Sequence, residues 1–348
     1  MKAPRPGTPG EPDTVLTPAP VWATIAGYQF YWAAVAGVEL GVFDALAESP
    51  ATVAALASRA GCAVSRLRSL ADVLVASGLL ERGPDDRYRI SDTARAFLVS
   101  GAERSMTDLL LRSPGPWQNW PALASTMRGA DPPGPADAAF YAALVQATFP
   151  TQYAAAKVLA SRLPAARAVL DLGAGAAPWS IALLEAFQAA RAVAIDLPAV
   201  LPAARAEVAE HALGDRFELI AGDYWEVPVD PEGFDVVVLG HILRAEGDRA
   251  PGLVSRAAAA LAPGGTLVVA DYFVDDDRSG PVNSLLLGLT MMAATTEGRT
   301  STRSEHRGWF EAAGLVGVEE HQLIPGQEVM TARKARSASE PSIPEEAS

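Results

Sequence analysis

The stretch that most constrains this chain is V-L-D-L-G-A-G-A-A-P-W-S, residues 169–180. Its first four residues indicate a buried strand that contains Asp171, and the apolar residues after Pro178 indicate a helix. Gly173 and Gly175 lie between the two, where the absence of a Cβ lets the backbone approach a ligand closely. Pro178 stands at the third position of a G-x-G-x-x-G pattern, so the turn predicts a bound nucleotide without specifying a pyrophosphate.

Four more apolar segments after this stretch are typical of buried strands, and helical segments separate them. The segments are residues 192–198, with the strand ending at Asp196, 217–225, with the strand ending at Asp223, 234–241 and 261–272. The helical segments include 204–211 and 253–261. Strands of almost continuous Val, Leu, Ile and Ala that alternate with helices predict a parallel sheet covered on both faces. The chain is therefore predicted to contain a doubly wound α/β domain.

Several acidic or glycine positions are predicted to meet at the carboxyl edge of this sheet, where ligands of such folds bind. They are Gly173, Asp196, Asp223 and Gly240. Asp196 follows Asp171 by 25 residues and ends the second strand. This is the spacing of a carboxylate that accepts the two ribose hydroxyls of a nucleotide.

The ordered motifs D-L-G-A-G, I-D-L-P, G-D-Y-W and L-A-P-G-G resemble those of the class I S-adenosylmethionine-dependent methyltransferases. With its N-terminal half included, the chain resembles the plant-type and bacterial small-molecule O-methyltransferases. This resemblance implies a Rossmann-like doubly wound sheet, an N-terminal α-helical winged-helix dimerisation domain, a homodimer and the cofactor S-adenosyl-L-methionine. It also implies transfer of a methyl group to a hydroxyl of a small, aromatic secondary metabolite, as in antibiotic biosynthesis.

The resemblance also implies roles for residues at the carboxyl edge. Gly173 and Gly175 are expected under the methionine part of the cofactor, Asp196 at the ribose, and Asp223 with Tyr224 beside the adenine. The full predicted set of cofactor contacts is Asp171, Gly173, Gly175, Asp196, Leu197, Asp223, Tyr224, Gly240 and His241.

Composition and charge limit the partners and the compartment. The net charge of −13 disfavours nucleic acid and an anionic membrane surface. The single cysteine, Cys62, excludes an internal disulfide, so we expect a cytoplasmic protein. The leader is rich in Pro and Gly, and we expect no signal peptide and no membrane span. The predicted divisions are a disordered leader (1–20), a winged-helix dimerisation domain (21–100), a helical linker that contributes to the substrate pocket (101–160), the methyltransferase domain (161–334) and a disordered tail (335–348).

Residues 21–46 are predicted to form one helix that is apolar around most of its circumference. Such a helix must be buried on more than one side. It is therefore expected to pack against a partner subunit, as the resemblance implies, or to lie at the centre of one domain.

Residues 51–100 have the pattern of a winged helix, with a second helix at 64–76, a polar turn at 83–86 and a short strand after it. Because such modules often bind DNA, a ligand-sensing regulator is an alternative function. Seven Arg and five acidic residues leave this region a net charge of only +2. Since phosphate contacts need a clustered basic face, the pattern favours a dimerisation scaffold.

Residues 101–160 are predicted to form short helices broken by prolines, and aromatic residues are frequent there. A domain junction over the strand ends is where a small-molecule pocket would form. Candidates for its walls are Trp117, Trp120, Tyr141 and Phe149, and the resemblance adds Met291 and Met292; ordinary core packing is the alternative for each. A short helix at 309–313 and edge strands on either side of Pro325 complete the predicted domain.

The catalytic chemistry is predicted at G-H-I-L-R-A-E-G, residues 240–247. In the resembled enzymes a histidine soon after the fourth strand is the general base, and Arg244 stands in its position. Because arginine stays protonated, Arg244 is expected to hold a carboxylate or phenolate, or to lower the pKa of an adjacent phenol. His241 is the remaining candidate base, or a neighbour of the cofactor; it shares a face with Arg244 if the helix has already begun.

The loss of the usual base leaves other chemistry open, namely methylation at carbon or nitrogen, or a non-methylating reaction on the same fold. The carboxylate partners of the plant enzymes are not evident, and the nearby acids are Glu246 and Glu297. His241, His306 and His321 lack the spacing of metal ligands, so no metal is predicted.

Overall fold

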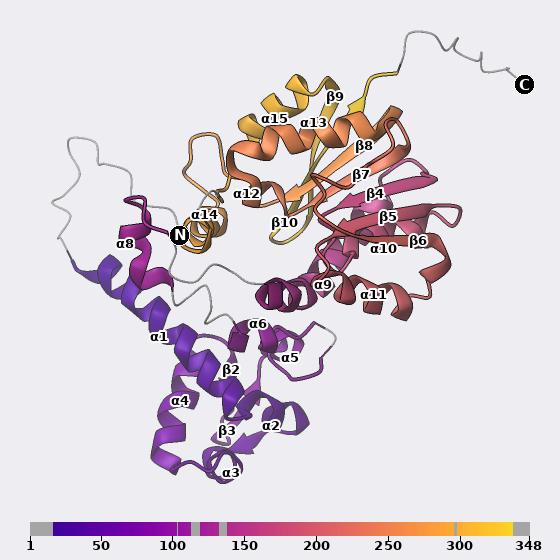
Figure 1. The fold of residues 1–348 in the computed structure, drawn as a ribbon. Coiled ribbons are helices and arrows are strands. Elements are labelled where there is room, and N and C mark those ends of the chain that lie inside the picture. Colours follow the sequence, from indigo (N-terminus) through magenta and orange to yellow (C-terminus); the bar gives the residue numbers. More distant parts are fainter. Residues whose placement is uncertain (1–16, 103, 113–118, 132–137, 296–297, 337–348) are drawn as a thin grey trace, which may run out of the picture. The chain divides into compact units, whose positions relative to one another are not determined.

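The computed structural model describes residues 17–102, 104–112, 119–131, 138–295 and 298–336. The chain divides into two compact units, residues 1–107 and 108–348. Each unit buries hydrophobic clusters of its own. Figure 1 shows the elements coloured along the chain.

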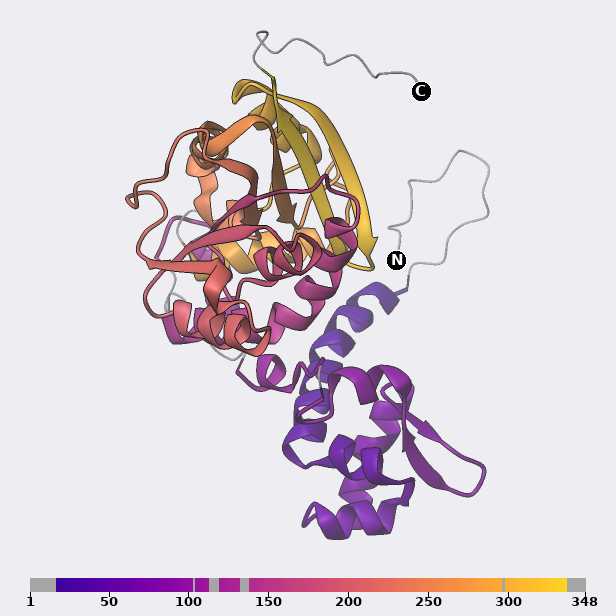
Figure 2. The same ribbon diagram turned by 90° about the vertical axis from the view of Figure 1, so that its right-hand side faces the viewer.

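The first unit combines helices with a small antiparallel sheet (Figure 2). Phe43, Leu56, Leu74 and Tyr88 are fully buried in its core, and the Tyr88 hydroxyl donates a 2.6 Å hydrogen bond to Asp72. Two helices followed by a hairpin confirm the predicted winged-helix pattern. The elements are α1 (Ala19–Glu39), α2 (Val42–Glu48), β1 (Ala51–Thr52), α3 (Val53–Arg59), α4 (Val64–Ala76), β2 (Leu80–Arg82), β3 (Arg87–Ile90) and α5 (Asp92–Phe97).

The prediction of one continuous helix over residues 21–46 is wrong. Gly41 has a φ of +65°, which ends the first helix and serves as the N-cap of the next. A left-handed backbone conformation is strained for residues with a Cβ but not for glycine. No single helix of the described residues is long and apolar enough to cross a membrane; α1 and α2, bent by 60°, meet that criterion only as a pair.

The second unit is built on a seven-stranded sheet in the order β6-β5-β4-β7-β8-β10-β9. Its strands are β4 (Ala168–Leu172), β5 (Arg191–Asp196), β6 (Phe217–Ala221), β7 (Phe234–Gly240), β8 (Leu261–Asp271), β9 (Leu315–Ile324) and β10 (Gln327–Lys334). Strands β4 to β8 are parallel, which confirms the predicted doubly wound sheet. The last two strands are antiparallel. Of these two, β9 lies at the edge of the sheet and β10 does not, because β10 pairs with β8 as well as with β9.

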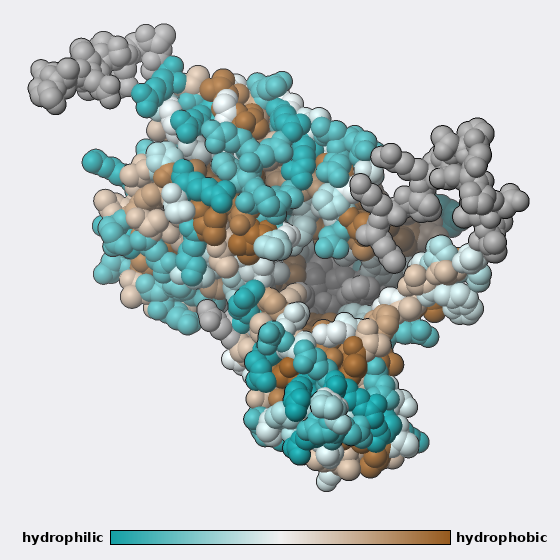
Figure 3. Space-filling model, turned by 180° about the vertical axis from the view of Figure 1, so that it is seen from behind, coloured by the Kyte–Doolittle hydropathy of each residue, from teal (hydrophilic) through white to brown (hydrophobic). Residues whose placement is uncertain are grey.

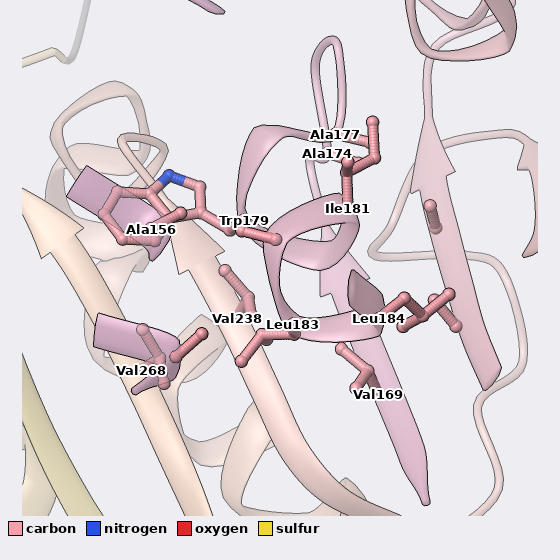
Figure 4. Close-up of a cluster of buried hydrophobic side chains, with 14 of the residues drawn as sticks. Ala156, Val169, Ala174, Ala177, Trp179, Ile181, Leu183, Leu184, Val238 and Val268 are labelled. Atoms are coloured by element: carbon pink, nitrogen blue, oxygen red, sulfur yellow. The ribbon is translucent and has the colours of Figure 1, made fainter. Parts of the chain in front are cut away.

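Successive residues of the central strands point to opposite faces of the sheet, as the pleat requires. Val236 and Val238 belong to the core formed with α9 (Ala138–Ala160), α10 (Pro178–Ala186) and α11 (Leu201–Glu210). Val237 and Leu239 belong to the core formed with α13 (Ala250–Ala260) and α15 (Arg303–Ala312). Figure 4 shows side chains of α10 in the first of these cores.

Two helical predictions for this unit need correction. α9 is a single helix of 23 residues, with Pro150 inside it, and not one of several short helices. Its packing against α10 buries Ala155, Ala156 and Leu159, which offsets the hydrogen bond that proline removes. α15 begins at Arg303, earlier than predicted, because Thr302 and Glu305 form a capping box.

Candidate active site

The turn between β4 and α10 requires its two glycines. Gly173 and Gly175 have φ values of +69° and +62°. A Cβ on Gly173 would lie 2.7 Å from Ile242 Cγ2, and one on Gly175 would lie 3.1 Å from Val145 Cγ1. The conformation and the close packing both disfavour larger residues here. The predicted close approach of this turn to a ligand stays a prediction.

Asp196 ends β5 directly beside this turn. One of its carboxylate oxygens accepts a hydrogen bond from the Gly175 N–H and the other accepts one from the Leu197 N–H, both at 2.7 Å. Burial raises the pKa of Asp196, and the two backbone donors act against that rise. Each oxygen keeps a second lone pair, so the carboxylate can fix the turn and still accept hydrogen bonds from a ligand.

Asp171 was predicted, like Asp196, to contact the cofactor, but its surroundings differ from those of Asp196. Its side chain is 1% exposed and accepts a 2.5 Å hydrogen bond from the Ser180 hydroxyl in α10. Burial, with the nearby Asp196, raises the pKa of Asp171 to about 7. It holds the strand and the helix together beneath the turn, and its contact with the cofactor stays a prediction.

The segment after β6 brings the Tyr224 ring toward the glycine turn. Tyr224 Cε1 lies 3.5 Å from where a Cβ on Gly173 would be. The Asp223 carboxylate accepts a 2.8 Å hydrogen bond from the Trp225 N–H and so shapes the turn that carries both rings. β6 ends at Ala221, two residues before Asp223, where the strand was predicted to end.

His241 follows β7 in a left-handed conformation with a φ of +61°, and its N–H donates to the Ala270 carbonyl at 2.7 Å. Its ring is 8% exposed and lies near the rings of Trp179 and Tyr272, with centroids 6.4 Å and 5.2 Å away. Burial and the charge of Arg244 lower the pKa of His241 to about 4.

Three side chains here, including His241 itself, carry buried polar atoms without a well-formed hydrogen bond among the described residues, although Gln327 is close enough to His241 to act against the lowering of the histidine pKa. These atoms are the Trp179 indole N–H, both ring nitrogens of His241 and the Gln327 Oε1 atom. Buried polar groups are almost always paired, so this part of the edge is suited to a polar ligand or to water.

Arg244 is held by a residue that sequence reasoning missed. Its Nη1 lies 3.3 Å from Asp271 Oδ1, and its backbone N–H donates to Asp271 Oδ2 at the same distance. Its Cζ lies 5.6 Å from the Tyr272 ring centroid. The D-Y pair ends β8, so the position of Asp271 at the carboxyl edge could have been read from the sheet pattern.

Two expectations about this segment were wrong. α12 (Leu243–Glu246) begins after His241, so His241 and Arg244 do not share a helix face. Both instead lie beside Tyr272, His241 through its ring and Arg244 through its guanidinium group. Glu246 faces Tyr224 and Trp225 rather than Arg244. Glu297 lies outside the described residues.

The candidates for the acceptor pocket are spread over several elements. Trp120 lies in the 3₁₀ helix η1 (Trp120–Ala122), which packs on α14 (Val282–Ala294), the helix that carries Met291 and Met292. α14 also packs against α12, the helix of Arg244. The structure thus places the elements that carry Trp120, the two methionines and Arg244 next to one another. Contact of these side chains with a substrate stays a prediction.

The remaining candidates for the walls of the acceptor pocket have different surroundings. Tyr141 in α9 is close enough to Arg244 for that charge to act against the rise in the tyrosine pKa caused by burial. Phe149 is buried in the core and stacks on Tyr153 with centroids 5.4 Å apart. Its packing therefore accounts for its burial, and its role as a pocket wall stays a prediction. Trp117 lies outside the described residues.

The fold and the residues at the carboxyl edge of the sheet together define a class of protein. A doubly wound sheet with a glycine turn after its first strand and a buried aspartate after its second is the arrangement of nucleotide-cofactor enzymes with a Rossmann-like domain. Among the described residues, no cluster of three His, Cys, Asp or Glu side chains is placed to hold a metal ion.

Comparison with known proteins narrows this class. Residues 136–316 match the O-methyltransferase domain model, and residues 22–100 match the O-methyltransferase dimerisation domain model. The chain therefore belongs to the O-methyltransferase family, and its cofactor is S-adenosyl-L-methionine. Several solved structures of the same fold contain S-adenosylmethionine or S-adenosylhomocysteine.

Two curated relatives and one solved structure illustrate the similarity. The tetracenomycin polyketide synthesis 8-O-methyltransferase TcmO of Streptomyces glaucescens is 30% identical over 87% of this chain and 93% of its own length. The N,N-dimethyltransferase OxyT of Streptomyces rimosus is 31% identical over 80% of this chain and 85% of its own. A crystal structure of an O-methyltransferase from Nostoc punctiforme, 25% identical, superposes with a TM-score of 0.82 over 92% of this chain and all of its own.

Proposed function

We propose that this enzyme methylates a phenolic hydroxyl of an aromatic, polyketide-type natural product, and that Arg244 replaces the usual base by holding and polarising the acceptor. The observation that carries the proposal is the fixed position of Arg244, paired with buried Asp271 and placed over the Tyr272 ring. The relative TcmO, a polyketide 8-O-methyltransferase by name, supports the acceptor class.

The residues at the carboxyl edge fit the cofactor. Gly173 and Gly175 provide the close backbone turn, and Asp196 offers the acceptor oxygens for ribose hydroxyls. The unpaired polar atoms of Trp179 and His241 suit the polar amino-acid end. When bound, S-adenosylmethionine supplies an electrophilic methyl group on its sulfonium.

Arg244 acts on the acceptor through its charge. A guanidinium group cannot accept a proton, but a positive charge beside a phenol favours the phenolate and lowers the phenol pKa. The hydroxyl proton then leaves to solvent, and the oxygen becomes a nucleophile before methyl transfer. His241, with its pKa lowered to about 4, is uncharged at neutral pH and too weak a base to drive this step; we assign it a hydrogen bond to a ligand.

The test begins with calorimetric titration of the purified protein with S-adenosylmethionine and S-adenosylhomocysteine, with NAD as the control. We expect micromolar binding of both sulfur compounds and none of NAD. Transfer of labelled methyl to a panel of hydroxylated naphthoates and anthraquinones then checks the acceptor class. Failure to bind either sulfur compound would overturn the proposal.

Methylation at nitrogen is the second candidate, because the relative OxyT is an N,N-dimethyltransferase by name. A nearby arginine also lowers the pKa of an ammonium group and exposes its lone pair, so Arg244 is compatible with this chemistry. Ring systems that carry either a hydroxyl or an amine at the same position discriminate between the two. Arg244→His should raise methylation of the hydroxyl compound only if oxygen is the native acceptor.

We further propose a homodimer formed through residues 21–100. The match to the dimerisation domain covers this region. In α1, Val21 and Trp22 are both 63% exposed and Tyr28 is 68% exposed. Tan and brown residues are interleaved with pale ones along this helix in Figure 3, so the surface that would be covered is apolar.

Sedimentation velocity tests the dimer. Trp22→Glu places a charge on the apolar helix and should shift the protein toward monomer. Val316→Glu is the matched control, because Val316 is also exposed, at 52%, but lies on strand β9 of the other unit. A wild-type monomer, or a dimer unaffected by Trp22→Glu, would contradict this interface.

A further inference from the structure

Glu246 is a buried carboxylate that the proposed chemistry does not use. It lies two residues after Arg244 in α12 and is 8% exposed. The Tyr224 hydroxyl donates to its Oε1 atom at 2.5 Å, and the Trp225 indole N–H donates to its Oε2 atom at 2.9 Å. Burying a carboxylate is unfavourable unless hydrogen bonds and charges replace its hydration. These two donors, together with the Arg249 Nε atom 3.6 Å from Oε2, explain its position.

We infer that Glu246 is a positioning residue that fixes Tyr224 and Trp225 for cofactor binding. The inference rests on the proposed function and on the expectation from the family resemblance that Tyr224 borders the adenine. The two rings follow β6, Glu246 lies in α12, and no backbone hydrogen bond between these segments is present among the described residues. The carboxylate is therefore the polar link between the cofactor side and the helix that carries Arg244.

Both donors are suited to a permanent link. Burial and the adjacent Glu246 raise the pKa of Tyr224, so its hydroxyl keeps its proton through the physiological range. The indole N–H is a donor only. The Arg249 Cζ atom lies 4.4 Å from the Trp225 ring centroid, and a Cβ on Gly252 would lie 3.3 Å from that ring. Trp225 is thus held by packing as well as by Glu246.

Tyr224 carries the effect to the glycine turn. Its ring and the Ile242 side chain occupy the space beside Gly173, at 3.5 Å and 2.7 Å from the position of a Cβ there. A Tyr224 ring released from Glu246 would reorient in this space. Because binding strength depends on groups held in place before the ligand arrives, the release should weaken cofactor binding.

The experiment compares four variants by calorimetric titration with S-adenosylmethionine and S-adenosylhomocysteine. Glu246→Ala should raise both dissociation constants about tenfold, the scale of one lost charge-assisted hydrogen bond. Glu246→Gln should stay within about threefold of wild type, because a carboxamide can accept from Trp225 and donate to the Tyr224 oxygen.

Tyr224→Phe should weaken binding without removing the carboxylate. Glu226→Ala removes an exposed acid beside Trp225 and is the charge-matched control.

Steady-state kinetics separate positioning from general damage. Glu246→Ala should raise the KM for S-adenosylmethionine about tenfold while kcat and the KM for the acceptor stay within about threefold. The double variant with Tyr224→Phe should be no worse than Glu246→Ala alone, because both remove the same interaction. If Glu246→Ala does not fold, the cofactor affinities of Tyr224→Phe and Glu246→Gln test the inference in its place.

Two results would overturn the inference. One is wild-type cofactor affinity in Glu246→Ala or in Tyr224→Phe. The other is a Glu246→Gln variant as weak as the alanine variant. Either leaves the proposed function intact as long as the wild-type protein binds both sulfur compounds. Absence of wild-type binding would instead remove the proposed function itself.

Discussion

Asp196 and Asp271 end two parallel strands of the same sheet, yet they have different surroundings. Asp196 is held by two backbone N–H groups, from Gly175 and Leu197. Asp271 accepts from the backbone N–H groups of Tyr272 and Arg244, and it is also paired with the Arg244 guanidinium group. Among the described residues, no cationic side chain is paired with Asp196.

The difference shows how one fold provides two kinds of site along one edge. A carboxylate held only by backbone donors keeps its charge and its spare lone pairs for a ligand, as a ribose requires. A carboxylate paired with arginine has its charge compensated, and its role is to fix the position of the cation. On the cofactor side, the Asp196 carboxylate thus offers hydrogen-bond acceptors. On the side of the methyl acceptor, Arg244 offers a positively charged group in a fixed position.

The largest expected effect is on cofactor binding, and it separates two single variants in which one or the other aspartate is replaced by alanine. Asp196→Ala removes a charged acceptor and the anchor of the Gly175 N–H, so S-adenosylmethionine should bind about 100-fold more weakly or not measurably. Asp271→Ala should leave that affinity within about threefold. Calorimetry measures both. Equal losses in the two variants would remove the distinction between the two sides.

Arg244→Ala should produce the next largest effect and should act only on the acceptor side. We expect kcat/KM for the acceptor to fall about 30-fold, with cofactor affinity unchanged, since one charge-assisted contact is lost. The pH at which the rate reaches half its maximum should rise, because the phenol no longer ionises beside a cation. Arg244→Lys is the control that keeps the charge without the forked geometry. An unshifted pH profile in Arg244→Ala would contradict a polarising role.

The smallest expected effect concerns stability, and it involves Asp171 and His241. Asp171 has a raised pKa of about 7, so its folded form holds a proton that the unfolded form loses, and stability falls as pH rises from about 4 to 7. His241 has a lowered pKa of about 4, so stability rises between pH 4 and 6.5. The two slopes oppose each other in the wild-type protein.

Asp171→Asn should remove the first slope alone, because the amide still accepts from Ser180 but does not ionise. The midpoint of thermal unfolding of this variant should rise with pH between 4 and 6.5 by a few degrees more than that of the wild type. Circular dichroism melts at a series of pH values provide the measurement, with Asp215→Asn, a change at an exposed residue, as the control. Parallel curves for wild type and Asp171→Asn would show that Asp171 titrates normally.

Much of the fold could be predicted because it follows from local pattern. Continuous apolar runs with helices between them determine a parallel sheet, and the glycines and Asp196 determine where its ligand edge lies. The failures were also local. The pattern over 21–46 did not reveal that Gly41 adopts a left-handed conformation, and the prolines before α9 led to a prediction of short helices that did not anticipate its 23 continuous residues.

The sequence by itself determined the sheet, the glycine turn, the family resemblance and the position of Arg244 soon after the fourth strand, because each depends on residues close together in the chain. The tertiary structure alone decided the partners of the charged side chains. Asp271 lies 27 residues from Arg244, and Tyr224 lies 22 from Glu246. No periodicity records such pairs, since they depend on which strand ends become neighbours and on the direction in which each buried side chain finds its hydrogen bonds.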